Sequence, residues 1–152
     1  MKVLGIDLST QNIAFCLLSI TELFGFSIQL NRFGRHKIRR QIIRECLEYF
    51  KPDFIVVESI RLFHKGFINV DVIKRLGGLV YLIVDFFGCN VYDIDVRSWK
   101  KNILGSAKVE KDYSIKYVKK KYDIIVSNND MSDAICIAEC GLRFKDKLKE
   151  IQ

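Results

Sequence analysis

The sequence predicts one α/β domain with a mixed five-stranded sheet, three antiparallel strands followed by two parallel ones, and helices on both faces. Three short apolar segments with tight connections open the chain, as in an antiparallel meander. A continuous apolar run then follows a helical segment, which is typical of a buried parallel strand. The length of 152 residues suits a single domain, and a hydrophobic share of 49% is enough for a packed core.

The first three strands are predicted at residues 2–8, 12–20 and 23–31. In the third of these, Phe24 and Phe26 alternate with small or polar neighbours, which is the two-residue period of a strand. The connections between the three segments are short, so neighbouring strands are expected to run antiparallel.

Residues 35–50 change to the helical period, with apolar side chains on one face and many basic side chains around the rest. Pro52 ends this helix, and an apolar strand is predicted at 53–58. A right-handed strand–helix–strand unit makes this strand parallel to the first one. Both strands then end at the same sheet edge, where open α/β sheets bind ligands, and Asp7 and Glu58 meet there.

The rest of the chain is predicted to form a loop at 59–68, helices at 70–87, 98–103, 109–121 and 130–145, and a fifth strand at 89–96. The helix at 70–87 is apolar on nearly every side, which is typical of a central helix or of one at a subunit interface. The tail at 145–152 is expected to fray. This order of strands and helices is that of the ribonuclease H-like architecture.

Four carboxylates converge in this arrangement, because Asp130 and Asp133 begin the last helix near Asp7 and Glu58. Clustered carboxylates raise one another's pKa unless cations intervene, and their hard oxygen atoms suit Mg²⁺ or Mn²⁺. Two such ions about 3.5–4 Å apart activate water and stabilise the leaving oxygen in phosphodiester hydrolysis. The four carboxylates are therefore predicted to be the catalytic metal ligands of a nuclease.

Each of the four carboxylates also has a purely structural interpretation. Asp7 and Glu58 are also consistent with simple strand ends, and Asp130 and Asp133 with a helix N-cap and its N3 carboxylate. Three further acids are excluded from the predicted site: Asp93, Asp95 and Asp123.

The net charge of +7 and the pI of about 9.2 favour an anionic partner such as nucleic acid. Basic side chains concentrate at 32–51 and 97–121, and Lys119–Lys121 are expected to neutralise phosphates. The longest apolar region is too short to span a bilayer, so no membrane partner is expected. The five cysteines form no CxxC pair, which argues against zinc and for reduced thiols in a cytoplasmic protein.

Four motifs of this chain, taken in order, resemble the RuvC family of Holliday junction resolvases, in a small phage-type form. Leu4-Gly5-Ile6-Asp7 is similar to the family's first catalytic strand, and residues 52–58 are similar to its second. Arg97-Ser98-Trp99-Lys100, continued by Gly105-Ser106-Ala107 and Lys111, resembles the family's basic stretch. The run 130–138 resembles its closing Asp-x-x-Asp-Ala helix.

This resemblance implies a homodimer that cuts two strands of a four-way DNA junction symmetrically, using Mg²⁺ with Mn²⁺ as a substitute. It implies metal-ligand roles for Asp7, Glu58, Asp130 and Asp133, and places the basic residues Lys100 and Lys111 near the scissile phosphate. Lys111 is therefore counted among the catalytic residues. The other expected DNA contacts are Arg61, Phe63, Lys65, Phe67, Arg97, Lys101, Ser106 and Lys108. If the protein is phage-encoded, its location is the cytoplasm of the bacterial host.

One departure from the family pattern is Arg61, which occupies a position where many members carry an aromatic residue. The base preference is therefore expected to be loose, with DNA shape outweighing sequence. Gly105 and Ser106, just ahead of the predicted helix at 109–121, are expected to offer backbone N–H groups to a phosphate.

Three other functions compete with junction cleavage. A non-enzymatic protein that binds branched DNA requires no metal, and a general ribonuclease H cuts RNA–DNA hybrids instead. The run from Gly5 to Asn12 also resembles the first phosphate loop of sugar kinases and actin, but that class needs a second such domain. The sequence identifies no helicase partner.

Overall fold

The computed structural model describes residues 1–8, 12–29, 44–45, 48–59, 78, 85 and 88–151, with the side chains of 28 and 29 excepted. The loop predicted at 59–68 and most of the helices predicted at 35–50 and 70–87 lie outside these residues.

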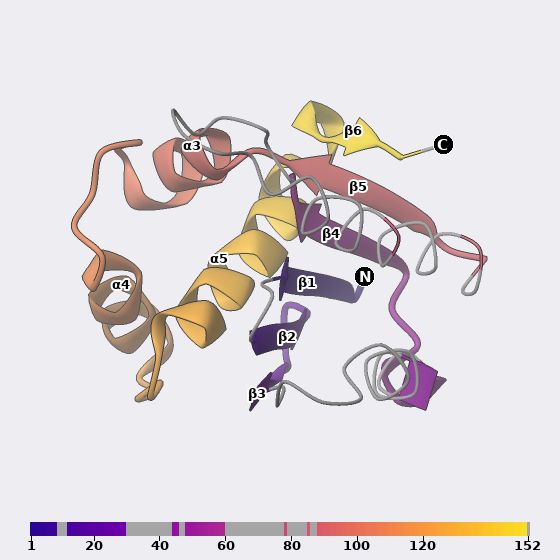
Figure 1. The fold of residues 1–152 in the computed structure, drawn as a ribbon, viewed down its shortest axis with the longest axis horizontal. Coiled ribbons are helices and arrows are strands. Elements are labelled where there is room, and N and C mark those ends of the chain that lie inside the picture. The colour runs from indigo at the N-terminus through magenta and orange to yellow at the C-terminus, as the bar shows by residue number, and fades with distance from the viewer. Residues whose placement is uncertain are drawn as a thin grey trace.

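One mixed sheet of six strands runs through the described part of the chain, in the order β3-β2-β1-β4-β5-β6 (Figure 1). The strands are β1 (Val3–Leu8), β2 (Asn12–Leu18), β3 (Leu23–Gln29), β4 (Phe54–Glu58), β5 (Asn90–Ile94) and β6 (Lys149–Glu150). The first three are antiparallel neighbours, whereas β4 is parallel to both β1 and β5. The predicted ribonuclease H-like arrangement is confirmed.

The sixth strand corrects the prediction of five strands and a frayed tail. Lys149 and Glu150 pair antiparallel with β5, and the Ile151 N–H donates to the Val91 carbonyl at 2.8 Å. The Lys145 ammonium also lies 4.8 Å from the centre of the Phe54 ring. A strand of two residues is too short to show a period of two, so the sequence pattern gave no sign of it.

Helices α3 (Val96–Trp99), α4 (Tyr113–Tyr122) and α5 (Asn129–Phe144) follow β5, and a π-helical segment η1 (Lys100–Leu104) continues α3. The three predicted helices after residue 97 are confirmed, but α4 begins later than expected. The π-helix ends at Gly105, whose φ of 83° is left-handed, and an irregular segment separates it from α4. None of the helices in the described part of the chain is long and apolar enough to cross a membrane.

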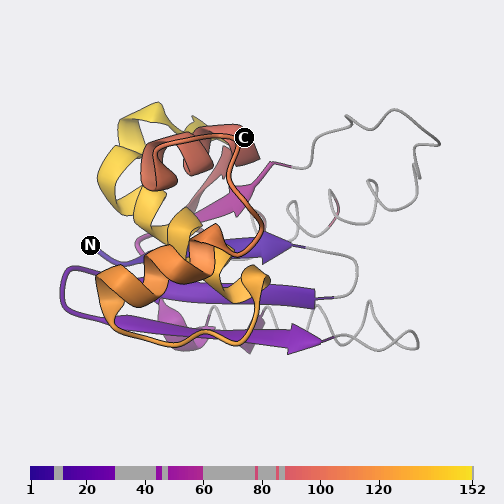
Figure 2. The ribbon, with the colours of Figure 1, turned by 90° about the vertical axis from the view of Figure 1, so that its left-hand side faces the viewer.

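Helix α5 packs directly on the sheet, and α4 packs on α5 (Figures 1 and 2). The closest approach is at Gly5 of β1. A Cβ atom at this position would lie 2.4 Å from the Ala134 carbonyl oxygen and 2.5 Å from the Ala138 nitrogen. Because these are backbone atoms of a helix, they cannot move aside singly. Gly5 therefore sets the distance at which α5 carries its carboxylates past β1.

Replacing Gly5 with alanine is expected to destabilise the fold, since the new methyl group forces α5 away from the sheet. Overpacking of this kind costs roughly 1–3 kcal/mol, or about 2–4 °C of Tm for each kcal/mol in a domain of this size. Thermal unfolding followed by circular dichroism measures the change. Gly78→Ala is the matched control, because Gly78 is helical and exposed and an added Cβ there meets nothing within 4 Å. Equal melting temperatures for wild type and Gly5→Ala would contradict this role.

Glu139 of α5 fastens α4 in place. Its side chain is almost fully buried, and it accepts hydrogen bonds at 2.9 Å from the hydroxyl groups of Tyr117 and Tyr122. Lys121 and Arg143 pair with the same carboxylate. Although burial raises the pKa of Glu139, these hydrogen bonds hold it below its usual range. All three lysines of this run are exposed, but the charge of Lys121 is paired with the buried Glu139. Lys119 and Lys120 therefore provide the charges of this run that Glu139 does not engage.

Candidate active site

The predicted carboxylates meet at one edge of the sheet, where β1 and β4 end and α5 begins. Parallel pairing of Ile6 with Val57 brings Asp7 and Glu58 to neighbouring positions. The negative charges of Glu58, Asp133 and Asp130 all act on Asp7. Three acids, Glu58, Asp130 and Asp133, therefore lie within electrostatic range of Asp7 in the structure.

Burial and neighbouring negative charges disfavour the ionised forms of Asp7, Glu58 and Asp133. Burial, followed by the charges of Glu58, Asp133 and Asp130, raises the pKa of Asp7 from its ordinary value of 3.8 to about 8. Burial also raises the pKa of Glu58 and of Asp133. The positive charge of Lys100 opposes the shift at all three residues. The site therefore gains free energy from any further positive charge that enters it.

The carboxylates suit a hard divalent cation that is coordinated partly by the protein and partly by the substrate. Within the described residues, no three His, Cys, Asp or Glu side chains are grouped closely enough to hold one ion by themselves. Mg²⁺ does not need such a cage, because it keeps several waters and binds through one or two carboxylates together with substrate phosphates. Separated carboxylates with raised pKa values match this kind of site better than a closed structural one.

Three neutral side chains form hydrogen bonds with the carboxylates. The Trp99 Nε1–H donates to Glu58 Oε2 at 2.7 Å, and the Asn12 amide donates to Asp130 Oδ2 at 2.8 Å. A hydrogen bond from the Ser114 side chain lowers the pKa of Asp133, against the larger effect of burial. None of these three roles was predicted from the sequence. Only Trp99 carried a usable signal, since a buried indole N–H must find an acceptor.

The helix-capping alternative for Asp130 and Asp133 is wrong. The N-cap of α5 is Asn128, whose side-chain oxygen accepts from the Met131 N–H at 2.9 Å. Asn128 also donates to the Ser27 hydroxyl at 3.0 Å, which ties the start of α5 to β3. With the cap provided by another residue, both aspartates are left to the site.

The three acids excluded from the predicted site have structural positions elsewhere. Asp95 is the N-cap of α3, where it accepts from the backbone N–H groups of Arg97 at 3.0 Å and Ser98 at 3.2 Å. Asp93 accepts a hydrogen bond from the Ser59 hydroxyl at 2.8 Å. Asp123 ends α4 in a left-handed conformation, with a φ of 55°.

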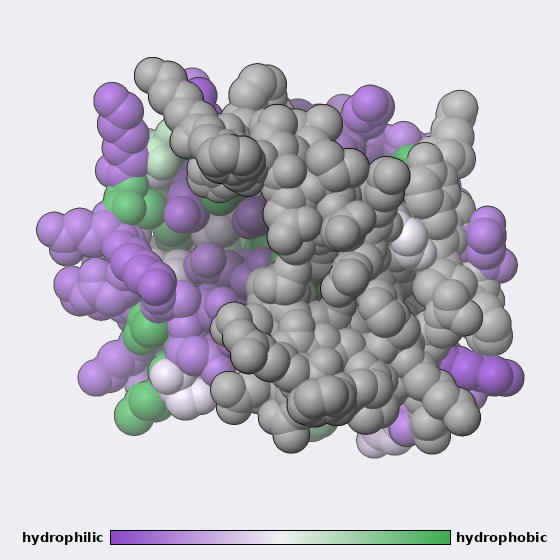
Figure 3. Space-filling view, viewed as in Figure 1, coloured by the Kyte–Doolittle hydropathy of each residue, from purple (hydrophilic) through white to green (hydrophobic). Residues whose placement is uncertain are grey.

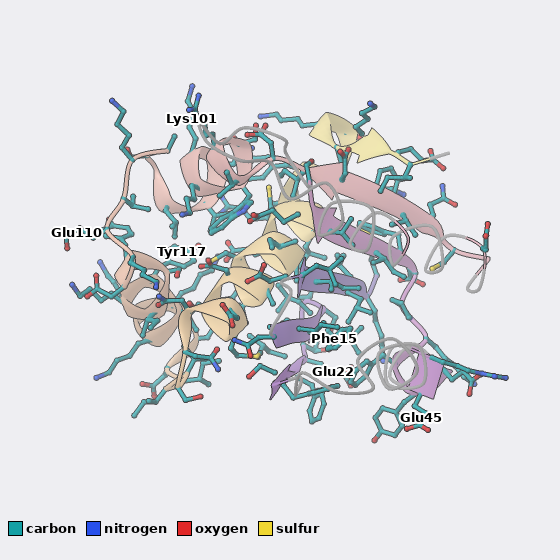
Figure 4. All side chains as sticks on the ribbon, viewed as in Figure 1. Phe15, Glu22, Glu45, Lys101, Glu110 and Tyr117 are labelled. Atoms are coloured by element: carbon teal, nitrogen blue, oxygen red, sulfur yellow. The ribbon has the colours of Figure 1, made fainter. Side chains whose placement is uncertain are left out.

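The predicted DNA-binding residues divide into three groups. Lys100 is half-buried beside the carboxylates, whereas an exposed set lies on α3, η1 and the segment leading to α4: Arg97, Lys101, Ser106, Lys108 and Lys111. Hydrophilic residues predominate on this side of the molecule, with hydrophobic residues between them (Figure 3), and Lys101 points outward there (Figure 4). Arg61, Phe63, Lys65 and Phe67 lie outside the described residues.

Ser106 does not have the position predicted for it. Helix α4 begins only at Tyr113, so the backbone of Ser106 is not part of a helix N-terminus. Its hydroxyl instead accepts from the Lys108 N–H at 3.2 Å within the connecting segment.

Comparison with known proteins gives one relative of similar length. The crossover junction endodeoxyribonuclease RuvC of Campylobacter hominis is 28% identical over 148 residues, which cover 91% of this chain and 93% of the relative. No family model matches the sequence.

Solved structures of Holliday junction resolvases share the fold. Thermus thermophilus RuvC in complex with a Holliday junction substrate superposes with a TM-score of 0.83 at 18% identity, over 99% of each chain. Fowlpox virus resolvase with its substrate Holliday junction DNA gives a TM-score of 0.56 at 13% identity, over 93% of this chain and 97% of that one. The ribonuclease H-like fold and the similarity to RuvC are thereby confirmed.

Proposed function

We propose that this chain, which is similar to RuvC over most of its length, is an endonuclease that resolves Holliday junctions and cuts other branched DNA. The observation that carries the proposal is the coupling of Asp7 with Glu58, Asp130 and Asp133 at one sheet edge. A basic surface adjoins this acidic centre, and that combination suits phosphodiester chemistry better than DNA binding alone.

The four carboxylates would hold two Mg²⁺ ions, with Mn²⁺ as a substitute. When bound, such ions supply an activated water and stabilise the leaving oxygen. Lys100 reduces the repulsion among the carboxylates before DNA arrives. Lys111 is assigned to the scissile phosphate, and the exposed basic residues of α3, η1 and the following segment would bind the junction arms.

Symmetrical cleavage of two strands requires two active sites, so we assign the protein a homodimeric state. The apolar helix predicted at 70–87 would form the subunit contact. The bases near the branch point would meet the loop that carries Arg61, Phe63, Lys65 and Phe67, through stacking and phosphate contacts. Action on DNA in a bacterium places the protein in the cytoplasm, which agrees with four free thiols among the described residues.

A single gel tests this function against its rivals. The protein is incubated, with and without Mg²⁺, with each of five labelled substrates: four-way junction, replication fork, flap, linear duplex and RNA–DNA hybrid. Paired cuts in the four-way junction, made only with Mg²⁺ and more slowly in the other branched DNAs, are expected. Binding without any cleavage would favour the non-enzymatic alternative, and preferential cutting of the hybrid would favour a general ribonuclease H. Sedimentation of the same sample as a monomer at micromolar concentration would contradict the dimer.

A further inference from the structure

Trp99 is the single tryptophan of the chain, and its side chain is completely buried. Its indole N–H donates to Glu58 Oε2 at 2.7 Å, so the bond joins the end of α3 to the end of β4. Other contacts fix the position of both ends. Asp95 caps α3, and the Ser59 N–H donates to the Ile94 carbonyl at 2.8 Å.

The chemistry of this bond suits a residue that orients a metal ligand. Packing alone does not explain a tryptophan at this position, because a phenylalanine would fill the same apolar space. A buried indole N–H also needs a hydrogen-bond acceptor, and Glu58 provides it. Because the indole is neutral, it fixes one carboxylate oxygen and leaves the negative charge of Glu58 in place. A lysine or arginine would instead neutralise that charge. Among the residues that the structure describes, the other oxygen, Oε1, accepts no hydrogen bond, as suits an oxygen that coordinates a cation.

The same ring also supports the cation nearest to the site. The Lys100 ammonium lies 5.3 Å from the centre of the Trp99 ring, within the range of a cation–π interaction. The charge of Lys100 acts on Glu58, Asp7 and Asp133. One buried ring therefore orients an acidic group and a basic group of the same centre.

We infer that Trp99 is a positioning residue, which sets the Glu58 carboxylate for divalent-cation binding. This inference rests on the proposed function, because it takes Glu58 to be a metal ligand. Residues that orient metal ligands by hydrogen bonds typically contribute about 10- to 100-fold to metal affinity or activity.

The test replaces Trp99 with phenylalanine, which removes the N–H and keeps an aromatic ring. Calorimetric titration with Mg²⁺ alone, in the absence of DNA, is expected to show about 10-fold weaker binding. In the Glu58→Gln background, the same substitution should cause no further loss, because the two residues then act through one interaction. Phe54→Leu is the matched control, since Phe54 is a buried aromatic residue of β4 at the strand's other end. This control should lower thermal stability and leave Mg²⁺ affinity unchanged.

A second measurement keeps Trp99 and therefore does not depend on whether Trp99→Phe folds. Because Trp99 is the only tryptophan, the tryptophan emission spectrum reports on its surroundings alone. Titration with Mg²⁺ should change that spectrum in the wild type and leave it unchanged in Glu58→Gln. The inference would be overturned if the wild type bound Mg²⁺ without a change in its emission spectrum. It would also be overturned if folded Trp99→Phe bound Mg²⁺ as tightly as the wild type. A wild type that neither binds Mg²⁺ in calorimetry nor cuts the four-way junction in its presence would instead contradict the proposed function.

Discussion

Cleavage of a four-way junction by Asp7→Asn is expected to be at least roughly 10³-fold slower than cleavage by the wild type, or about 4 kcal/mol of lost transition-state stabilisation. Asp7 is the carboxylate on which the charges of the other three act, so it lies at the centre of the proposed cation site. Asparagine has nearly the same shape but removes that charge. Binding to the junction should change little, because the contacts to phosphates come from basic residues elsewhere.

Single-turnover cleavage of labelled junction measures the rate, and gel shift without divalent cation measures the affinity. Asp146→Asn is a suitable control, because Asp146 is an exposed acid in the 3-10 helix Lys145–Lys147, outside the acidic cluster. It should cut at the wild-type rate. If Asp7→Asn also cut at that rate, the sheet edge formed by β1 and β4 would not be the active site.

The meeting of Asp7 with Glu58 could be predicted because it depends only on periodicity and on the handedness of a strand–helix–strand unit. Asp130 and Asp133 were harder, since a helix start with acidic residues is equally consistent with capping. The structure decides this because Asn128, two residues earlier, makes the cap. The pattern of apolar residues does not indicate which polar side chain, Asn128 or an aspartate, caps the helix.

The residues that support the site escaped prediction for the same reason. Asn12 and Ser114 contact aspartates that are distant in sequence, and these contacts depend on how α4, α5 and the sheet are packed. Lys121 belongs to a run of basic residues that resembles a DNA-binding surface, yet it pairs with the buried Glu139. Composition identifies the charge of a helix, whereas only packing shows which of its charges remain available to a ligand.

The stability of the metal-free protein is expected to fall as the pH rises from about 4 to 8. The pKa of Asp7 is about 8 in the folded protein, compared with an ordinary value of 3.8, so the folded state retains a proton that the unfolded state has released. Each pH unit in this interval then costs about 1.4 kcal/mol for that one proton. The contribution of Asp7 to the free energy of unfolding is therefore complete below pH 4 and is lost once the pH passes 8. The raised pKa values of Glu58 and Asp133 act in the same direction.

Denaturant unfolding at a series of pH values, in the presence of a chelator, measures this loss. Asp7→Asn should be more stable than the wild type at pH 8 and should depend less on pH, because the group that titrates is gone. Mg²⁺ should restore wild-type stability most strongly at high pH, where the carboxylates are charged and no proton has to be displaced. The same cation should stabilise Asp7→Asn much less. A wild-type protein whose metal-free stability rises between pH 5 and 8 would show that the acidic cluster is not strained, and would remove the electrostatic argument for a cation at this edge.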